Sequence, residues 1–343
     1  MRYISIEAVE PGQYLGKTIF SSNGAVLLAE KVQLTVYMIT TLKRIGVTML
    51  YIKDKDTDDV EIQDVVSDET KVAVMHKLTE IYQSINSGKD FFTRNISVNV
   101  NTLLDEISRN KDVLVQLTDI RTKDNEQYIH AINVCIMSVL IGINMSLNQL
   151  QLKELAVGAL LHDIGKLELL TDDESNDVKR HHTWRGFELL KSKREFSLLI
   201  AHIAFQHHEH MDGSGMPRQL PAEQIHQYAR IVAVANTYDN LLSPLHQSST
   251  MHPYEACEHL MALAGATLDR DIVIHFLRTV SIYPTGISVR LTNHMTGVVV
   301  GQHRGLPGRP IIRVIKREDD NELEITEIDL AKQPTVFVEA VLS

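Results

Sequence analysis

The chain has 343 residues, 44% of them hydrophobic, and a formal net charge of −10. This length predicts more than one domain, and the hydrophobic content is that of a soluble globular protein with sizeable cores. The negative charge argues against a general binder of nucleic-acid polymers or membrane surfaces, because such proteins display a basic patch. An anionic substrate would need local positive charge, which bound metal ions supply.

Residues 1–60 are predicted to form a small β-rich domain. Asn23-Gly24 lies between two apolar runs, which indicates a hairpin. A short helix is expected at about 34–44, ended by Gly46, and a strand at about 47–52. The segment has no long apolar stretch typical of a signal peptide, so a cytoplasmic protein is expected.

Residues 61–118 are predicted to be an acidic linker followed by a helical connector. The segment at 53–69, KDKDTDDVEIQDVVSDE, is acidic and lacks aromatic residues, which favours a solvated linker. Apolar residues then recur at helical spacing up to residue 118.

Helical signals continue through residues 119–282. The longest apolar run, AINVCIMSVLIGINM at 131–145, includes asparagines and is expected to be a buried helix rather than a membrane span. In residues 283–343 the pattern changes to Val- and Ile-rich runs separated by turns, which predicts a small β unit.

His162-Asp163 is the first candidate metal site. Adjacent side chains on a helix point about 100° apart, so the pair can flank a metal, with the aspartate bridging two ions. A polar patch at a helix end, before the helix-stopping Gly165, is the simpler alternative. Lys166 follows closely and is a cation placed to meet an anionic group.

A second histidine cluster, His207-His208, ends the apolar segment SLLIAHIAF and is followed by a glycine-rich turn. Neutral imidazoles are common ligands for transition metals. Glu126 and His130 are four residues apart and project from one helix face. Spacing alone leaves His181 and His182 as competing ligands.

The order of these motifs resembles that of HD-GYP domains, which belong to the HD superfamily of metal-dependent phosphohydrolases. The resemblance runs from about residue 119 to residue 282. The matching segments are HDIGK at 162–166, a histidine four residues before Gly186, HHEHMDGSGMP at 207–217 and ARIVAVANTYDNL at 229–241. It implies a mainly α fold with an all-helical core, and the β-rich flanks resemble units found beside such cores.

The resemblance also implies the roles of individual residues. It implies two or three divalent ions, iron or manganese, and it selects His182 over His181. Asp163 and Lys166 would be catalytic, with Lys166 meeting the scissile phosphate. The implied metal ligands are Glu126, His130, His162, Asp163, His182, His207 and His208, with Asn236 as a weak ligand. The implied substrate-binding residues are Lys166, Asp212, Gly215, Met216, Pro217 and Arg218.

Four features depart from the family pattern. Met216 replaces the tyrosine of GYP and lacks its hydroxyl and aromatic face. Asn236 replaces an aspartate and is a neutral, weaker donor. The segment LSPLHQSS at 242–249 has no arginine where the family has a basic stretch, and the loop at 167–180 is shorter than usual and acidic.

The sequence therefore predicts a metal-dependent phosphodiesterase that hydrolyses cyclic di-GMP to linear pGpG or GMP. Two alternatives remain open. One is a catalytically weakened HD-GYP protein that binds cyclic di-GMP or partner proteins, and the other is a phosphohydrolase for another nucleotide. The expected partners are a cyclic dinucleotide and signalling proteins, with a homodimer left open and neither a nucleic-acid polymer nor a membrane expected.

Overall fold

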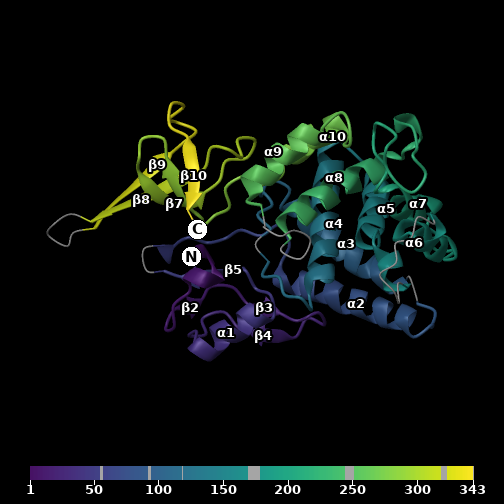
Figure 1. Ribbon diagram of the computed structural model, residues 1–343, viewed down its shortest axis with the longest axis horizontal. Helices are drawn as coiled ribbons and strands as arrows, with labels where there is room; N and C mark the ends of the chain where they lie inside the picture. The colour runs from purple at the N-terminus through teal and green to yellow at the C-terminus, as the bar shows by residue number, and fades with distance from the viewer. Residues whose placement is uncertain are drawn as a thin grey trace.

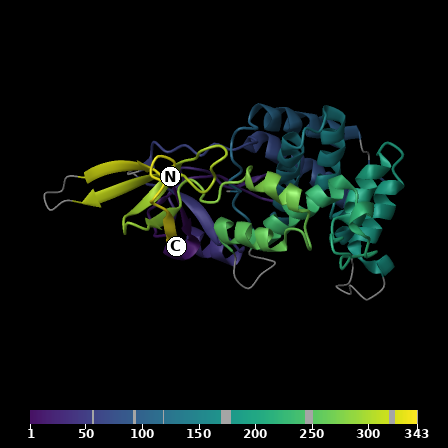
Figure 2. The same cartoon turned by 90° about the horizontal axis from the view of Figure 1, so that it is seen from above.

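The computed structural model describes residues 1–54, 57–91, 94–117, 119–168, 178–243, 251–317 and 323–342. Within these residues the chain folds as a helical core with a small β-rich unit at each end, and both termini lie on the β side of the molecule (Figures 1 and 2). The predicted mainly α fold class is confirmed. The domain boundaries at residues 60, 118 and 282 remain predictions.

The N-terminal unit packs short strands and one helix around its own apolar core. The predicted hairpin is confirmed, because β3 and β4 pair antiparallel and Gly24 between them has a φ of +79°. The predicted helix begins after Thr35, whose hydroxyl accepts a hydrogen bond from the Met38 amide. The elements are β1 (Arg2–Ser5), β2 (Tyr14–Leu15), β3 (Ile19–Phe20), β4 (Val26–Leu28), α1 (Val36–Arg44) and β5 (Met49–Lys53), with a sheet order β1-β5-β2.

The helical core surrounds α4, which runs through its middle (Figure 1). Among the described residues, α4 is the one helix long and apolar enough to cross a membrane, yet 89% of its most apolar window is buried inside the fold. The predicted buried helix is therefore confirmed. The helices are α2 (Asp68–Asn86), α3 (Arg94–Arg109), α4 (Glu126–Asn144), α5 (Gln149–Leu160), α6 (His182–Lys191), α7 (Leu198–Gln206), α8 (Gln227–Leu242), α9 (Pro253–Leu263) and α10 (Arg270–Leu277).

The C-terminal unit is a five-stranded antiparallel sheet in the order β10-β6-β7-β8-β9. Its apolar face encloses a third core, which includes Val289, Val299 and Ile312. The predicted β unit is confirmed. The strands are β6 (Ser288–Leu291), β7 (Thr296–Gly301), β8 (Ile311–Arg317), β9 (Leu323–Asp329) and β10 (Val338–Leu342).

The acidic segment after β5 is not the solvated linker that its composition predicts. Val60, Val65 and Val66 in it are buried. Its acids also meet cations of other elements, since Asp64 pairs with Lys17 at 2.5 Å and Asp59 pairs with Arg313 of β8 at 2.6 Å. The prediction was wrong because the average composition of the segment is acidic, whereas its few valines are buried and anchor it.

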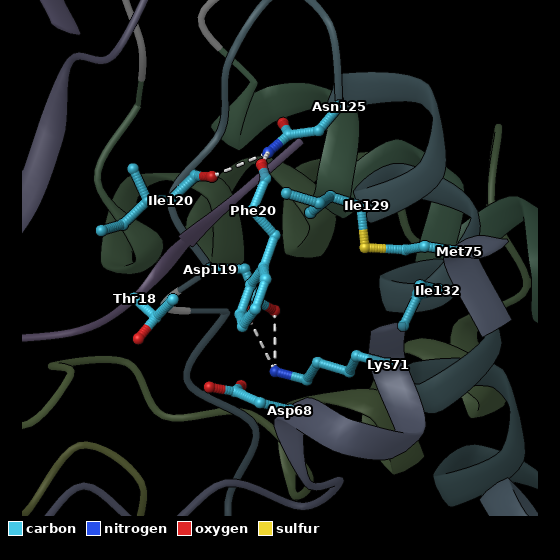
Figure 3. A pocket seen from close by; sticks show the side chains of 10 residues that line it. All are labelled: Thr18, Phe20, Asp68, Lys71, Met75, Asp119, Ile120, Asn125, Ile129 and Ile132. Carbon is cyan, nitrogen blue, oxygen red and sulfur yellow. Dashed lines mark hydrogen bonds and ion pairs between the residues drawn. The ribbon is translucent and has the colours of Figure 1, made fainter. Parts of the chain in front are cut away.

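The N-terminal unit fixes the segment that leads into α4. The backbone amide of Ser22 donates to Oδ2 of Asp124 at 2.9 Å, and Nδ2 of Asn125 donates to the Phe20 carbonyl at 2.7 Å. Close by, the buried Lys71 of α2 forms a partly buried ion pair with Asp119 at 2.7 Å (Figure 3). The start of α4 is therefore held by contacts from both the hairpin and α2.

A close backbone approach joins the two parts of the core that contain His162 and His182. The 3-10 helix η3 (Ile164–Glu168) crosses α6 at Gly165. A Cβ atom added to Gly165 would lie 2.0 Å from the His182 carbonyl oxygen and 2.6 Å from the Gly186 amide nitrogen. Only glycine fits here without moving one of the two segments.

We predict that Gly165→Ala destabilises the protein by about 2 kcal/mol or more, because two backbones must separate. Gly186→Ala is the matched control, since its added Cβ would have its nearest contacts at 3.4 Å, an ordinary van der Waals distance. Thermal unfolding of both variants measures the difference. Equal midpoints for the two variants would contradict the close approach.

A pH dependence follows from the Lys71–Asp119 pair. Burial alone would raise the pKa of Asp119, but the charges of Lys71 and Lys17 outweigh it and lower the pKa to about 2. A carboxyl whose pKa is lower in the folded state than its unfolded value of about 4 contributes stability above pH 4, which is lost as the pH falls through 2. The size of this contribution is on the order of 2 kcal/mol.

Urea unfolding between pH 4.5 and pH 2.5 tests this. The native protein should lose more stability over that interval than Asp119→Asn, which has no proton to bind there. Substitution of the exposed Asp105 by asparagine is the control and should leave the native slope. If Asp119→Asn also keeps the native slope, the ion pair does not contribute as described.

Candidate metal centre

The candidate ligands come from four places in the helical core. His130 lies on α4, and His182 is the first residue of α6. The His162-Asp163 pair follows the end of α5, and the His207-His208 pair follows the end of α7. Both pairs thus emerge where a buried apolar helix ends, so the packing of that helix fixes the position of its polar end.

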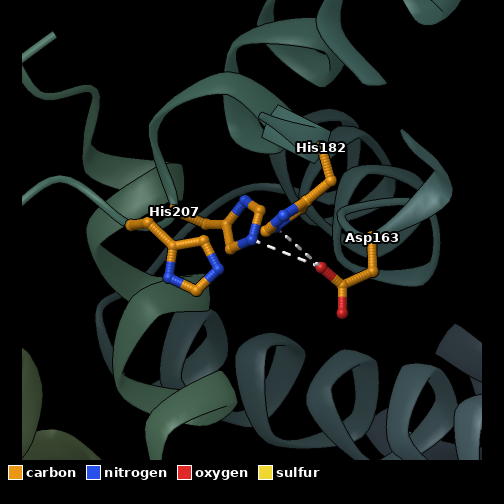
Figure 4. A group of neighbouring side chains, drawn as sticks. Asp163, His182 and His207 are labelled. Atoms are coloured by element: carbon orange, nitrogen blue, oxygen red, sulfur yellow. Dashed lines mark ion pairs between the residues drawn. The ribbon is translucent and has the colours of Figure 1, made fainter. Parts of the chain in front are cut away.

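Asp163 lies between two groups of side chains whose candidate ligand atoms are within 4.8 Å of one another. Its Oδ2 atom is 3.4 Å from Nε2 of His162 and 3.6 Å from Nε2 of His130. Its Oδ1 atom is 3.4 Å from Nε2 of His182 and 3.5 Å from Nε2 of His207 (Figure 4). We call these the His130 group (His130, His162 and Asp163) and the His182 group (Asp163, His182, His207 and His208).

Hydrogen bonds fix the orientation of three imidazole rings. Nδ1 of His162 donates to the Ala159 carbonyl at 2.7 Å, and Nδ1 of His207 donates to the Ala204 carbonyl at 2.9 Å. Nδ1 of His130 donates to a carboxylate, Oδ2 of Asp239, at 2.7 Å. In each ring the Nε2 atom is left with its lone pair, which is how metal-binding histidines are commonly oriented.

Burial sets the charges of the centre. It lowers the pKa of His162 to about 3 and that of His182 to about 2, so both rings are neutral at pH 7. Burial alone would raise the pKa of Asp163, but the nearby histidines and Lys166 hold it well below its ordinary value. His162 and His182 are therefore neutral imidazoles beside the Asp163 carboxylate.

These residues fit divalent metal ions. Nε2 of His130 and Nε2 of His162 face each other at 3.2 Å although both rings donate from Nδ1, so two lone pairs meet without a proton between them. Oδ1 of Asp163 and Nε2 of His207 are buried, lie 3.5 Å apart and have no hydrogen-bond partner among the described residues. Two ligands each about 2.1 Å from one ion lie roughly 3.0–3.4 Å apart, close to the spacings found here.

Two predicted ligands lie outside both groups. Glu126 is buried, with Oε1 2.7 Å from Arg121 Nη1 and 2.5 Å from the Ser243 hydroxyl. Asn236 is also buried, and its Oδ1 accepts a hydrogen bond from Asn240 at 3.0 Å. The other carboxylate oxygen of Glu126, Oε2, is buried without a hydrogen-bond partner among the described residues, and Glu126 lines the same cavity as His130. The roles of Glu126 and Asn236 as metal ligands stay predictions.

The predicted catalytic lysine is at the centre. Nζ of Lys166 lies 2.6 Å from Oδ2 of Asp163, and its side chain is 45% exposed. Lys166 can therefore contact both the carboxylate and a bound molecule. The cavity beside it has a volume of about 340 Å³, and its lining includes His130, Asp163 and Lys166.

The predicted substrate loop lies next to the His182 group. The backbone amide of Met216 donates to the His208 carbonyl at 2.9 Å, and Arg218 donates its amide to Glu209 at 2.7 Å. A Cβ on Gly215 would lie 2.2 Å from the His210 amide nitrogen, so glycine is required for this fold of the loop. The remaining loop residues are Asp212, which accepts hydrogen bonds from Ser214, and Pro217.

Two of the departures noted in the sequence fall largely outside the described residues. These are the arginine-free segment at 242–249, of which 242 and 243 are described, and the acidic loop at 167–180, of which 169–177 are not described.

Sequence reasoning missed several residues around the centre. Asp239 orients His130 and pairs with Arg121, and its place three residues after Asn236 on α8 was a usable signal. Tyr82 and Lys123 line the cavity, but they lie outside every recognised motif and no spacing pointed to them.

Comparisons with known proteins agree with this geometry. A family model described as an HD domain matches residues 103–272, and one described as a KOW domain associated with HD domain matches residues 288–343. A solved structure of an HDG"Y"P protein from Bdellovibrio bacteriovorus has a TM-score of 0.51 and 17% identity, and the match covers 80% of this chain and 97% of that one. This last likeness concerns the fold alone.

Curated relatives include cyclic di-GMP phosphodiesterases. One from Pseudomonas aeruginosa is 34% identical over 215 residues, covering 59% of this chain and 51% of its own. The response regulator RpfG of Xanthomonas campestris pv. campestris, also named a cyclic di-GMP phosphodiesterase, is 38% identical over 152 residues, covering 40% of this chain and 39% of its own. This chain thus spans about half or less of the length of these relatives.

The order of the histidine motifs, the helical core that gathers them around Asp163 and the match to the HD domain model lead to one assignment. The chain belongs to the HD domain family.

Proposed function

We propose that this protein is a metal-dependent phosphodiesterase that hydrolyses cyclic di-GMP to linear pGpG or GMP in bacterial second-messenger signalling. The observation that supports this most is the position of Asp163, with one oxygen facing each histidine group beside a cavity that Lys166 also lines. Relatives named as cyclic di-GMP phosphodiesterases support the choice of substrate.

We place two divalent ions at this centre, one in each histidine group, with Asp163 shared between them. The sharing is suggested by the two carboxylate oxygens, which face different groups. Mixed imidazole and carboxylate sites accept several divalent ions, and we propose iron or manganese. When bound, such ions supply Lewis-acid stabilisation of charge on phosphoryl oxygens.

Glu126 and Asn236 are left outside this two-ion centre. Arg121 neutralises Glu126, and the Ser243 hydroxyl shares the same carboxylate oxygen. Asn236 offers only a neutral carbonyl oxygen, which Asn240 already uses. Oε2 of Glu126 is buried and has no hydrogen-bond partner among the described residues, so a third ion would meet that oxygen. Such an ion would lie beside the positive charge of the Arg121 guanidinium, which disfavours it, and Arg121 is also paired with the buried Asp239 at 3.1 Å.

The side chains of the centre suit an anionic diester. Neutral imidazoles hold metal without adding negative charge that would repel phosphate. The Lys166 ammonium, half exposed beside Asp163, is placed to donate to a phosphoryl oxygen as charge develops on it. The loop from Asp212 to Arg218, attached through Met216 to the His208 carbonyl, forms the substrate side next to the His182 group.

A second candidate function is a signalling module that binds a cyclic dinucleotide without cleaving it. Met216 favours this reading, because the side chain is 39% exposed and has neither the hydroxyl nor the ring face of the family tyrosine. Cleavage of a different cyclic dinucleotide is the third candidate, since relatives also include a 3'3'-cGAMP-specific phosphodiesterase of Vibrio cholerae.

We predict that the native protein, loaded anaerobically with Fe(II) or Mn(II), holds two ions and cleaves cyclic di-GMP. Asp163→Asn should lose most of the metal and at least a hundredfold in turnover, because the shared carboxylate is removed. Asn236→Asp should leave both the metal content and the rate within about threefold of native. Metal analysis and chromatographic detection of pGpG and GMP give the two readouts.

His259→Ala is the control, because His259 is an exposed histidine of α9 that belongs to neither group. A native protein that holds two ions and binds but does not cleave cyclic di-GMP would replace the enzyme by the module. A gain of metal and activity confined to Asn236→Asp would contradict the two-ion centre.

A further inference from the structure

One wall of the metal cavity comes from residues that lie outside the histidine motifs. Tyr82 is on α2, and Lys123 precedes α4. The same cavity is lined by His130 and Asp163 of the centre. A molecule bound over the metal centre would therefore contact this wall.

The N-terminal unit holds Lys123 in place. Its backbone amide donates to the Ile45 carbonyl at 2.9 Å. Its aliphatic stem crosses Gly46, where an added Cβ would lie 3.0 Å from Lys123 Cγ and 3.5 Å from Cε. The Lys123 side chain is exposed and forms no ion pair with any described residue. The neighbouring Asp124 already accepts from the Ser22 amide.

Tyr82 offers a neutral donor to the same cavity. Its ring is buried against the ring of Tyr128, with centroids 5.2 Å apart. Burial and the nearby Asp163 carboxylate raise the pKa of Tyr82, so the hydroxyl keeps its proton. No described residue forms a hydrogen bond with that hydroxyl, which is not among the fully buried polar atoms and is therefore open to a molecule in the cavity that Tyr82 lines.

Ordinary packing explains only part of this arrangement. It accounts for the Tyr82 ring on Tyr128 and for the Lys123 stem on Gly46. It makes no use of the Lys123 ammonium or the Tyr82 hydroxyl, for which the described residues supply no partner although both residues line the metal cavity. Both groups are accessible from the cavity, and a ligand bound there would contact them together.

We propose that the Lys123 ammonium and the Tyr82 hydroxyl bind a phosphate group of the substrate in the metal cavity. This inference rests on the proposed phosphodiesterase function and names binding residues that the motifs do not. A charge-assisted hydrogen bond from Lys123 and a neutral one from Tyr82 suit a non-bridging phosphate oxygen. The N-terminal unit thereby contributes to the substrate site, through Ile45 and Gly46.

The test is steady-state hydrolysis of cyclic di-GMP by the full, Mn(II)-loaded chain. Lys123→Ala should raise KM roughly tenfold or more, with kcat within about threefold, since a charge-assisted hydrogen bond is lost from binding. Lys123→Arg should recover most of the affinity. Tyr82→Phe keeps the ring and should raise KM about fivefold. Lys89→Ala, at an exposed lysine outside the cavity lining, is the matched control.

Metal content separates binding from folding, and all four variants should match native in bound manganese. Unchanged KM in both Lys123→Ala and Tyr82→Phe would overturn the inference and leave the phosphodiesterase intact. If Lys123→Ala loses metal as well as affinity, the residue is structural and the inference also fails.

If the native protein does not cleave cyclic di-GMP, the proposed function falls and a second measurement decides the inference. Calorimetric titration of inorganic phosphate into the Mn(II)-loaded native protein should show binding that Lys123→Ala weakens roughly tenfold. Equal affinity in the two proteins, or no phosphate binding by the native chain, would overturn it.

Discussion

The Nε2 atoms of four buried histidines face the two oxygens of Asp163. The surrounding structure depends on a cation that binds these electron-rich atoms together. Nδ1 of His162 donates to the Ala159 carbonyl and Nδ1 of His130 donates to Asp239. In the neutral rings both Nε2 atoms, 3.2 Å apart, therefore carry a lone pair and no proton. Such an arrangement is costly in a water-poor interior unless a cation lies between the rings. Asp163 supplies the compensating negative charge, and its two oxygens divide the histidines into two groups. The hydrogen bonds that orient the histidine rings therefore favour metal binding as much as the ligand atoms themselves do.

The fold makes this geometry possible by ending buried helices at the centre. The second half of α5, from Leu155, is apolar and buried, and so is most of α7. The two helices pack against each other, and the histidine pairs follow directly after their ends. Gly165 lets η3 approach α6 closely enough to bring His182 to Asp163. The hairpin of the N-terminal unit then fixes the entry to α4, which bears His130. The β unit at the N-terminus is thus part of the scaffold of the site.

The histidine pairs of the centre could be predicted from local sequence. The residues that surround them could not, because tertiary packing brings them there. Adjacent pairs such as His162-Asp163 and His207-His208 follow apolar helices, so their clustering at a core edge is visible in the chain. The Glu126–His130 spacing correctly placed both residues on α4, but it could not reveal that Ser243, 117 residues away, and Arg121 hold the carboxylate. The same limit applies to Tyr82 and Lys123, whose neighbours are set by tertiary packing alone. Average composition also hid the valines that bury the acidic segment before α2.

The main proposal is that two metal ions bind at this centre and share Asp163. Anomalous X-ray diffraction from crystals of the Mn(II)-loaded protein measures this directly. Two peaks are expected, one within bonding distance of His130 and His162 and the other within bonding distance of His182 and His207, with Asp163 contacting both. A single ion, or an ion bound by Glu126 with Arg121 displaced, would contradict it.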